Sequence, residues 1–157
     1  MKPCLILTFI LGAFALPSFA QDAASLRRTQ FNLQDGVALG GYDAVAYFKQ
    51  DKAVKGRKDL AVFYQGAKYY FSSTENAGAF KSNAAKYEPQ YGGWCAYAMG
   101  KNGSKVEVDP ETYKITDGKL FVFYNKFLTN TLKSWNKDEA ALKKSADANW
   151  RKFYQNL

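Results

Sequence analysis

The clearest hairpin signal in the chain is Tyr113-Lys114-Ile115-Thr116-Asp117-Gly118-Lys119-Leu120-Phe121-Val122-Phe123-Tyr124. The Asp-Gly pair readily adopts the two positive φ angles of a type I′ turn, whose twist matches that of the flanking strands. Residues 113–116 and 119–124 are rich in β-branched and aromatic side chains, which favour strands. We therefore predict an antiparallel β-hairpin that turns at Asp117-Gly118.

A second hairpin is predicted upstream of this one. Two aromatic runs, 61–64 and 68–71, are separated by the short segment Gln65-Gly66-Ala67. Hydroxyl residues then precede a helix predicted over 77–81, and Glu88-Pro89 ends the next short helix. Further upstream, Asp43 is suited to cap a short helical turn over 44–48.

Helical periodicity begins at Lys126 and continues to the C-terminus. The apolar residues that recur at helical spacing are Leu128, Leu132 and Trp135, followed by Ala141, Leu142, Ala146, Trp150 and Phe153. We expect an α+β fold in which small antiparallel β-hairpins pack with short helices, and C-terminal amphipathic helices complete the domain.

The N-terminus has the plan of a secretory signal peptide. Met1-Lys2 supplies a positive charge, residues 4–16 are almost entirely apolar, and Pro17-Ser18-Phe19-Ala20 places small residues after a helix break. We predict a signal peptide over 1–20, a flexible segment over 21–30 and a single domain over 31–157. The protein is then exported, to the periplasm or outside the cell, and an uncleaved N-terminal anchor is the alternative.

The formal net charge of +8 suggests contact with anionic partners. In an exported protein these would be lipid headgroups, envelope polymers or acidic proteins, and we do not expect nucleic acid. The lysines are scattered along the chain, which favours a solvated surface with weak association to anionic surfaces over a dedicated anion site.

The chain contains no histidine, and Cys95 is its only cysteine once Cys4 leaves with the leader. These two facts exclude histidine-activated nucleophiles, histidine metal sites and an internal disulfide. They also argue against zinc and haem as cofactors. An enzyme is therefore less expected than a binding protein.

Cys95 lies in Tyr91-Gly92-Gly93-Trp94-Cys95-Ala96-Tyr97, and three hypotheses for it stay open. It can be a small buried residue, because free cysteine is among the most buried side chains. It can bind Cu(I) with Met99, which lies one helical turn further on and offers a second soft ligand. It can also be a redox or intermolecular thiol, because an unpaired cysteine is unusual outside the cytoplasm.

Two further sets of side chains are candidates for a site. The residues that could line a small pocket near Gly92-Gly93 are Tyr42, Asp43, Tyr70, Tyr91 and Trp94. The carboxylates that could pair for catalysis are Asp43, Glu75, Asp109 and Asp147. Each of these carboxylates also has a plain structural role in a cap, a turn or a helix face, which we favour.

Residues 42–99 carry a resemblance to the YHS domain family. Its core pattern is matched by Gly66-Ala67-Lys68-Tyr69-Tyr70-Phe71-Ser72-Ser73, then Phe80 and Ala85-Lys86-Tyr87, and its opening by 41–48. The wider pattern, from 37–43 through 91–96 and 117–120 to 146–150, is similar to stand-alone exported YHS proteins of bacteria. The resemblance thus implies a YHS-like fold over nearly the whole predicted mature chain.

The resemblance does not bring the family's metal chemistry with it. In metal-linked YHS domains three cysteines occupy the positions that align with Ala46, Ser72 and Asn76 here. A methyl group cannot ligate, and a neutral hydroxyl or amide is a poor ligand for a soft metal.

Three functions follow as hypotheses. The first is a binding module for copper or a small ligand near Cys95. The second is an interaction or structural protein of the envelope in which Cys95 belongs to the core, and the third is a thiol redox protein. The exposure of the Cys95 sulfur discriminates among them, because a sealed sulfur favours the second and an exposed one the first or third.

Overall fold

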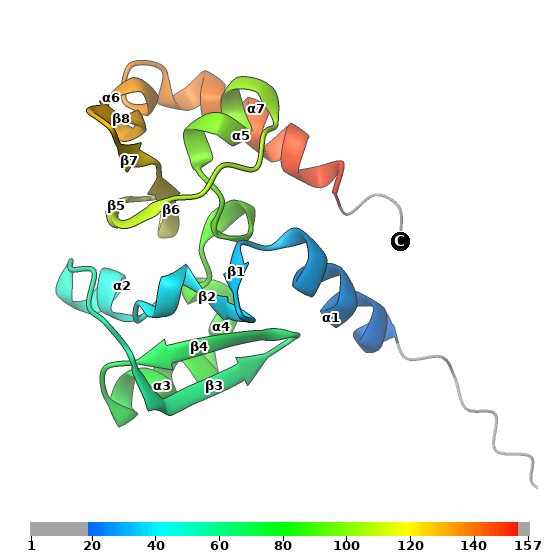
Figure 1. Ribbon diagram of the computed structural model, residues 1–157, viewed down its shortest axis with the longest axis vertical. Helices are drawn as coiled ribbons and strands as arrows, with labels where there is room; N and C mark the ends of the chain where they lie inside the picture. The colour runs from blue at the N-terminus through cyan, green and yellow to red at the C-terminus, as the bar shows by residue number, and fades with distance from the viewer. Residues whose placement is uncertain (1–18, 154–157) are drawn as a thin grey trace, which may run out of the picture.

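The hairpin predicted over 113–124 forms and lies between two groups of helices (Figure 1). The computed structural model describes residues 19–153. In it, β5 (Asp109–Thr116) pairs antiparallel with β6 (Lys119–Phe123). The turn residues Asp117 and Gly118 have φ angles of 52° and 68°, as the Asp-Gly signal requires.

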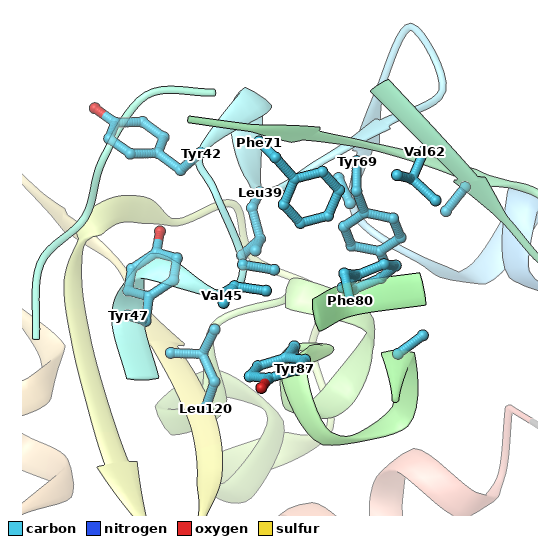
Figure 2. Close-up of a cluster of buried hydrophobic side chains, with 14 of the residues drawn as sticks. Leu39, Tyr42, Val45, Tyr47, Val62, Tyr69, Phe71, Phe80, Tyr87 and Leu120 are labelled. Atoms are coloured by element: carbon cyan, nitrogen blue, oxygen red, sulfur yellow. The ribbon is translucent and has the colours of Figure 1, made fainter. Parts of the chain in front are cut away.

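Strand β6 is buried on both of its faces, and this joins the two halves of the protein. Leu120 and Val122 belong to one hydrophobic cluster, whereas Phe121 and Phe123 belong to a second. Successive strand residues point to opposite faces, so one short strand supplies side chains to both cores. Figure 2 shows Leu120 in the first cluster, beside Val45 and Tyr87.

The first half is built on a four-stranded sheet with strand order β1-β2-β4-β3. Its strands are β1 (Leu33–Gln34), β2 (Val37–Ala38), β3 (Arg57–Tyr64) and β4 (Ala67–Phe71). The predicted hairpin is β3–β4, which turns at Gln65-Gly66 because Tyr64 pairs with Ala67. The short helix η1 (Leu39–Gly41) follows β2 directly.

Three short helices complete this half, and they are α2 (Ala46–Gln50), α3 (Thr74–Ser82) and α4 (Ala84–Tyr87). Phe80 of α3 packs on the rings of Tyr69 and Phe71, with ring centroids 4.6 and 5.0 Å away (Figure 2). Ser73 caps α3 by accepting a 3.1 Å hydrogen bond from the Asn76 amide. The helices predicted at 77–81 and before Glu88-Pro89 are therefore confirmed.

The second half consists mainly of helices (Figure 1). Phe121 and Trp135 belong to the hydrophobic cluster of this half. The helices are η2 (Gln90–Gly93), α5 (Ala96–Asn102), α6 (Thr131–Trp135) and α7 (Glu139–Arg151). Helices α5 and α7 approach closely at Gly100, where a Cβ atom would lie 2.6 Å from the Leu142 carbonyl oxygen. The mixed α+β fold and the C-terminal helix are thus confirmed.

The segment 21–30, predicted to be flexible, belongs to a helix, α1 (Phe19–Gln30). This helix is held by Arg27, whose guanidinium donates to the Gln65 carbonyl oxygen at 2.9 Å and forms an ion pair with Glu88. The sequence prediction missed it because these anchoring contacts are remote in the chain. Residues 1–18 of the predicted signal peptide lie outside the described residues. None of the helices that the structure describes has the length and apolarity needed to cross a bilayer.

A third hairpin replaces the start of the predicted C-terminal helix. Strands β7 (Asn125–Lys126) and β8 (Thr129–Asn130) pair antiparallel, and Phe127-Leu128 forms the turn. The following helix begins only at Thr131, where the Asn130 side chain accepts a 3.0 Å hydrogen bond from the Leu132 amide. Leu128 therefore does not share a helix face with Leu132 and Trp135, as periodicity had predicted.

Candidate functional site

Cys95 lies immediately before α5 and has no exposed surface. Its sulfur accepts a 3.4 Å hydrogen bond from the Tyr124 amide and lies 3.4 Å from Thr131 Oγ1. The Thr131 hydroxyl donates to the Tyr124 carbonyl oxygen at 2.9 Å, so the thiol is the donor in the contact with Thr131. The thiol is therefore enclosed and satisfied as both donor and acceptor.

These contacts place Cys95 at the base of the β7–β8 hairpin, where Tyr124 and Thr131 face each other; we call these two residues the neck. Tyr124 directly precedes β7 and Thr131 directly follows β8, and the Thr131 amide donates to the Tyr124 carbonyl oxygen at 3.0 Å. The one buried thiol thus forms hydrogen bonds with both residues of the neck. Cys95 is therefore a small buried residue, as one of the three hypotheses for it expected.

A second set of contacts holds the hairpin from the β5 side. The Asn125 side chain donates to Thr112 Oγ1 at 2.9 Å, and Thr112 in turn donates to the Asp109 carboxylate at 2.9 Å. Asn125 also reaches that carboxylate at 3.4 Å. The candidate carboxylate Asp109 therefore has a structural role, in which it helps to fix β7.

The tip of this hairpin is apolar and fully exposed. The residues Phe127 and Leu128 have exposures of 91% and 109%, so both side chains project into solvent. Their φ angles are 50° and 63°, in the left-handed region that Gly and Asn occupy readily but bulky residues rarely do. We call Phe127 and Leu128 the hairpin tip. Sequence analysis missed it, and the available signal was an Asn at each end of 125–130, since Asn favours chain reversals.

Met99 is buried in a different environment from the Cys95 sulfur. It packs in the second hydrophobic cluster with Phe121, Phe123 and Trp135, whereas Cys95 faces the hairpin neck. Within the described part of the chain, no group of three or more His, Cys, Asp or Glu is placed to hold a metal ion. The pair proposed for Cu(I) is therefore one buried thioether in an aromatic core and one thiol already engaged in hydrogen bonds.

A small pocket of about 230 Å³ opens beside the neck. Cys95, Val106 and Tyr124 contribute to its wall together with Thr131, and Lys101 of α5 also lines it. The half-buried side chains around it are largely apolar, which suits a small apolar molecule.

The five residues proposed to line one pocket are not brought together. Tyr42 and Tyr70 line two separate surface hollows, and Tyr91 lines a third, a cleft of about 460 Å³. Trp94 is instead anchored by its indole N–H, which donates to the Gln30 carbonyl oxygen at 2.6 Å. Asp43 is completely buried, so in this structure the five side chains do not line one common pocket.

Two tyrosines of this set, Tyr42 and Tyr91, are held neutral by their surroundings. The Tyr42 hydroxyl donates to Glu111 at 2.7 Å, and this hydrogen bond, with burial, raises the pKa of Tyr42 to about 12. Burial raises the pKa of Tyr91 further, and its hydroxyl donates to Asp147 at 2.9 Å. Asp147 thus accepts a structural hydrogen bond, and neither phenol is poised to act as a base.

Asp43 organises the first half of the protein. One carboxylate oxygen accepts from the amides of Val45 and Ala46 at 2.9 and 3.2 Å, which confirms its capping role. The other accepts from the Ser72 amide and hydroxyl at 2.8 and 2.6 Å and from the Asn76 amide group at 2.8 Å. The positions aligned with the thiols of metal-linked YHS domains, Ala46, Ser72 and Asn76, therefore meet around one carboxylate.

Comparison of the chain with family models, curated proteins and solved structures finds no match. The assignment to the YHS family thus stays a prediction, and the function has to be argued from the geometry described above.

Proposed function

We propose that this protein is an exported interaction module of the cell envelope, which works by docking through the β7–β8 hairpin. The observation that carries the proposal is the hairpin tip, where two large apolar side chains are held in solvent on a left-handed backbone. Left-handed bulky residues cost about 1 kcal/mol or more each, a cost that burial normally offsets. Here burial requires a partner.

The surroundings of Cys95 support the same function. The Cys95 thiol forms hydrogen bonds with both residues of the neck and so helps to hold the hairpin in place. This is a structural role. An enclosed thiol reacts slowly with substrates, because thiolate attack requires access and a stabilised negative charge. We accordingly favour an interaction role for this protein over redox chemistry or copper binding.

Export with removal of residues 1–20 is part of the proposal, because it places a basic protein next to envelope surfaces. The protein recovered from outside the cytoplasm should begin near Gln21, and intact-mass analysis measures this directly. A membrane-bound product that retains Met1 to Ala20 would overturn the export part of the proposal.

The docking part is tested by retention on washed cell envelopes. We compare the parent with a double variant, Phe127→Asn with Leu128→Gly, which installs the favoured I′ turn pair and removes both apolar side chains. The parent should sediment with the envelopes and the double variant should stay in the supernatant. Equal sedimentation of the two proteins, or none by either, would contradict docking through the tip.

A second candidate function rests on the pocket of about 230 Å³ beside the neck, which is suited to a small apolar ligand. Indole serves as a probe, followed by its effect on the amide NMR signals of residues around Val106. The shifts should vanish in Val106→Phe, whose larger side chain fills the pocket. A parent that shows no shift with indole would remove this candidate.

A further inference from the structure

The hairpin tip contributes little to the protein's own fold. Phe127 and Leu128 are the most exposed large apolar residues of the described chain, and neither belongs to a hydrophobic cluster. Their backbone conformation is unfavourable for bulky side chains. Folding alone would therefore favour Asn and Gly at these two positions.

The tip is nevertheless presented on a firm base. Cys95 bonds to both sides of the neck, and Asn125 is fixed by Thr112 and Asp109. Figure 1 places the hairpin at the edge of the protein beside α6. The two apolar side chains are thus held outward before any partner arrives, which lowers the entropic cost of binding.

The charged residues that flank the tip in the sequence are all positive. Residues 118–137 contain four lysines, at 119, 126, 133 and 137, and no Asp or Glu. Lys126 precedes the tip and Lys133 lies on α6; both are exposed, and neither takes part in a salt bridge in the described structure. The carboxylate that contacts β7 is Asp109, and its oxygens already accept from Thr112 and Asn125.

We propose that the partner of the hairpin tip is an anionic lipid bilayer. Phe127 and Leu128 enter the boundary between headgroups and acyl chains, while Lys126 and Lys133 lie at the level of the headgroup phosphates. This inference rests on the proposed docking function and specifies its partner.

The size and shape of the tip favour a bilayer over a protein partner. A specific protein interface buries roughly 1,000 Å² or more and needs a complementary surface on both sides. Two adjacent side chains at a convex turn provide much less area. A bilayer accepts a convex apolar tip without shape complementarity, and nearby cations add to the affinity. The resulting association is weak, reversible and sensitive to salt.

The test is sedimentation with vesicles of defined lipid and no protein. We use the exported form of the protein with phosphatidylethanolamine vesicles that contain phosphatidylglycerol, and with neutral phosphatidylcholine vesicles. The parent should bind the anionic vesicles, bind the neutral ones at least about tenfold more weakly, and be released by added salt.

Variants separate the apolar and the charged contributions. Phe127→Asn with Leu128→Gly should lower the partition coefficient on anionic vesicles by about tenfold or more, and Phe127→Trp should retain binding. Lys126→Gln should lower it by about fivefold. The matched control is Phe63→Ser, because Phe63 is 74% exposed on β3 and lies outside the β7–β8 hairpin. This control should bind like the parent.

Several outcomes would overturn the lipid partner. Binding to anionic vesicles that survives the double variant would show that the tip does not insert. Absence of vesicle binding, together with tip-dependent retention on washed envelopes, would assign the tip to an envelope protein and leave the docking function standing. Failure on both vesicles and envelopes would remove both proposals.

Discussion

The β5–β6 and β7–β8 hairpins turn through similar left-handed backbone conformations with opposite kinds of residue. Asp117 and Gly118 have φ angles of 52° and 68°, and Phe127 and Leu128 have φ angles of 50° and 63°. The first turn uses residues that the geometry favours, whereas the second uses residues that it penalises. Where a fold tolerates such a penalty, the side chains themselves are the feature to explain.

The two hairpins also differ in what holds them. Strand β6 is fixed by the packing of alternate side chains into two hydrophobic clusters. The β7–β8 hairpin has only two residues in each strand, and polar contacts to Cys95 and Asn125 secure its neck. The first hairpin therefore provides stability, and the second can be altered with little effect on the core.

The largest expected difference comes from removing a phenylalanine ring in each hairpin. Phe121 is buried against Tyr91 and Trp135, so Phe121→Ala should lower the free energy of unfolding by about 3–5 kcal/mol. Phe127→Ala should change it by less than about 0.5 kcal/mol, because the ring is in solvent. Urea denaturation of both variants measures the contrast. Similar losses in the two variants would show that the tip is part of the core.

The next effect concerns the neck. Cys95→Asp would bury a carboxylate in place of a neutral thiol and should lower the free energy of unfolding by about 3 kcal/mol. Cys95→Ala removes little volume and should cost about 1 kcal/mol. A thiol reagent should react slowly with the native protein and rapidly after denaturation. Immediate reaction in the native state, with a tolerated Cys95→Asp, would contradict the buried neck.

Much of the fold could be predicted from the sequence because the signals were local. The Asp117-Gly118 turn, the β3–β4 hairpin and the Asp43 cap each depend on residues next to one another in the chain. Helix α1 could not be predicted in this way, because Arg27 is held by Gln65 and Glu88, far along the sequence.

The candidate site was harder to predict for two physical reasons. Phe127-Leu128 carries no turn signal, since bulky residues rarely adopt left-handed φ angles, and the apolar spacing of Leu128 imitated a helix. The tyrosines proposed for one pocket lie on different elements and point to different hollows, which a linear pattern cannot show. Burial of Cys95 could be anticipated from residue type, but its contacts with Tyr124 and Thr131 could not.

Exchanging the turn residues of the β5–β6 and β7–β8 hairpins should have an intermediate effect on stability. Phe127→Asn with Leu128→Gly should raise the free energy of unfolding by about 1 kcal/mol, because the left-handed penalty is relieved. Asp117→Phe with Gly118→Leu should lower it by about 1–2 kcal/mol. The Asp117–Lys143 ion pair adds little to this, because Asp117 is 69% exposed.

Thermal or urea unfolding of the two exchange variants provides the measurement. A tip variant that gains stability while it loses docking cannot owe its loss of docking to misfolding, so this measurement also serves as a control for the binding experiments. A tip variant less stable than the parent would show that Phe127 and Leu128 make contacts that stabilise the protein.

The smallest expected effect is a change in the free energy of unfolding at alkaline pH, and it concerns the β5–β6 hairpin. Two residues of strand β5 accept hydrogen bonds from tyrosines of the sheet half. The Tyr42 hydroxyl donates to the Glu111 carboxylate at 2.7 Å, and the Tyr47 hydroxyl donates to the Pro110 carbonyl oxygen at 2.9 Å. The pKa of Tyr42 is raised to about 12 by its hydrogen bond to Glu111 and by burial. Between the usual pKa of about 10 and this value, the unfolded chain loses the Tyr42 proton while the folded protein retains it.

The sign of the pH dependence follows from this difference. The stabilisation from Tyr42 is fully present below about pH 10 and is lost as the pH rises towards 12, because the unfolded state then binds fewer protons. Unfolding free energies measured over this interval should fall less steeply in Tyr42→Phe than in the parent. Lys126→Gln, in the β7–β8 hairpin, should leave the slope of the unfolding free energy against pH over the same interval unchanged. An equal slope in Tyr42→Phe and the parent would show that the Tyr42–Glu111 bond does not attach the first hairpin to the sheet half of the protein.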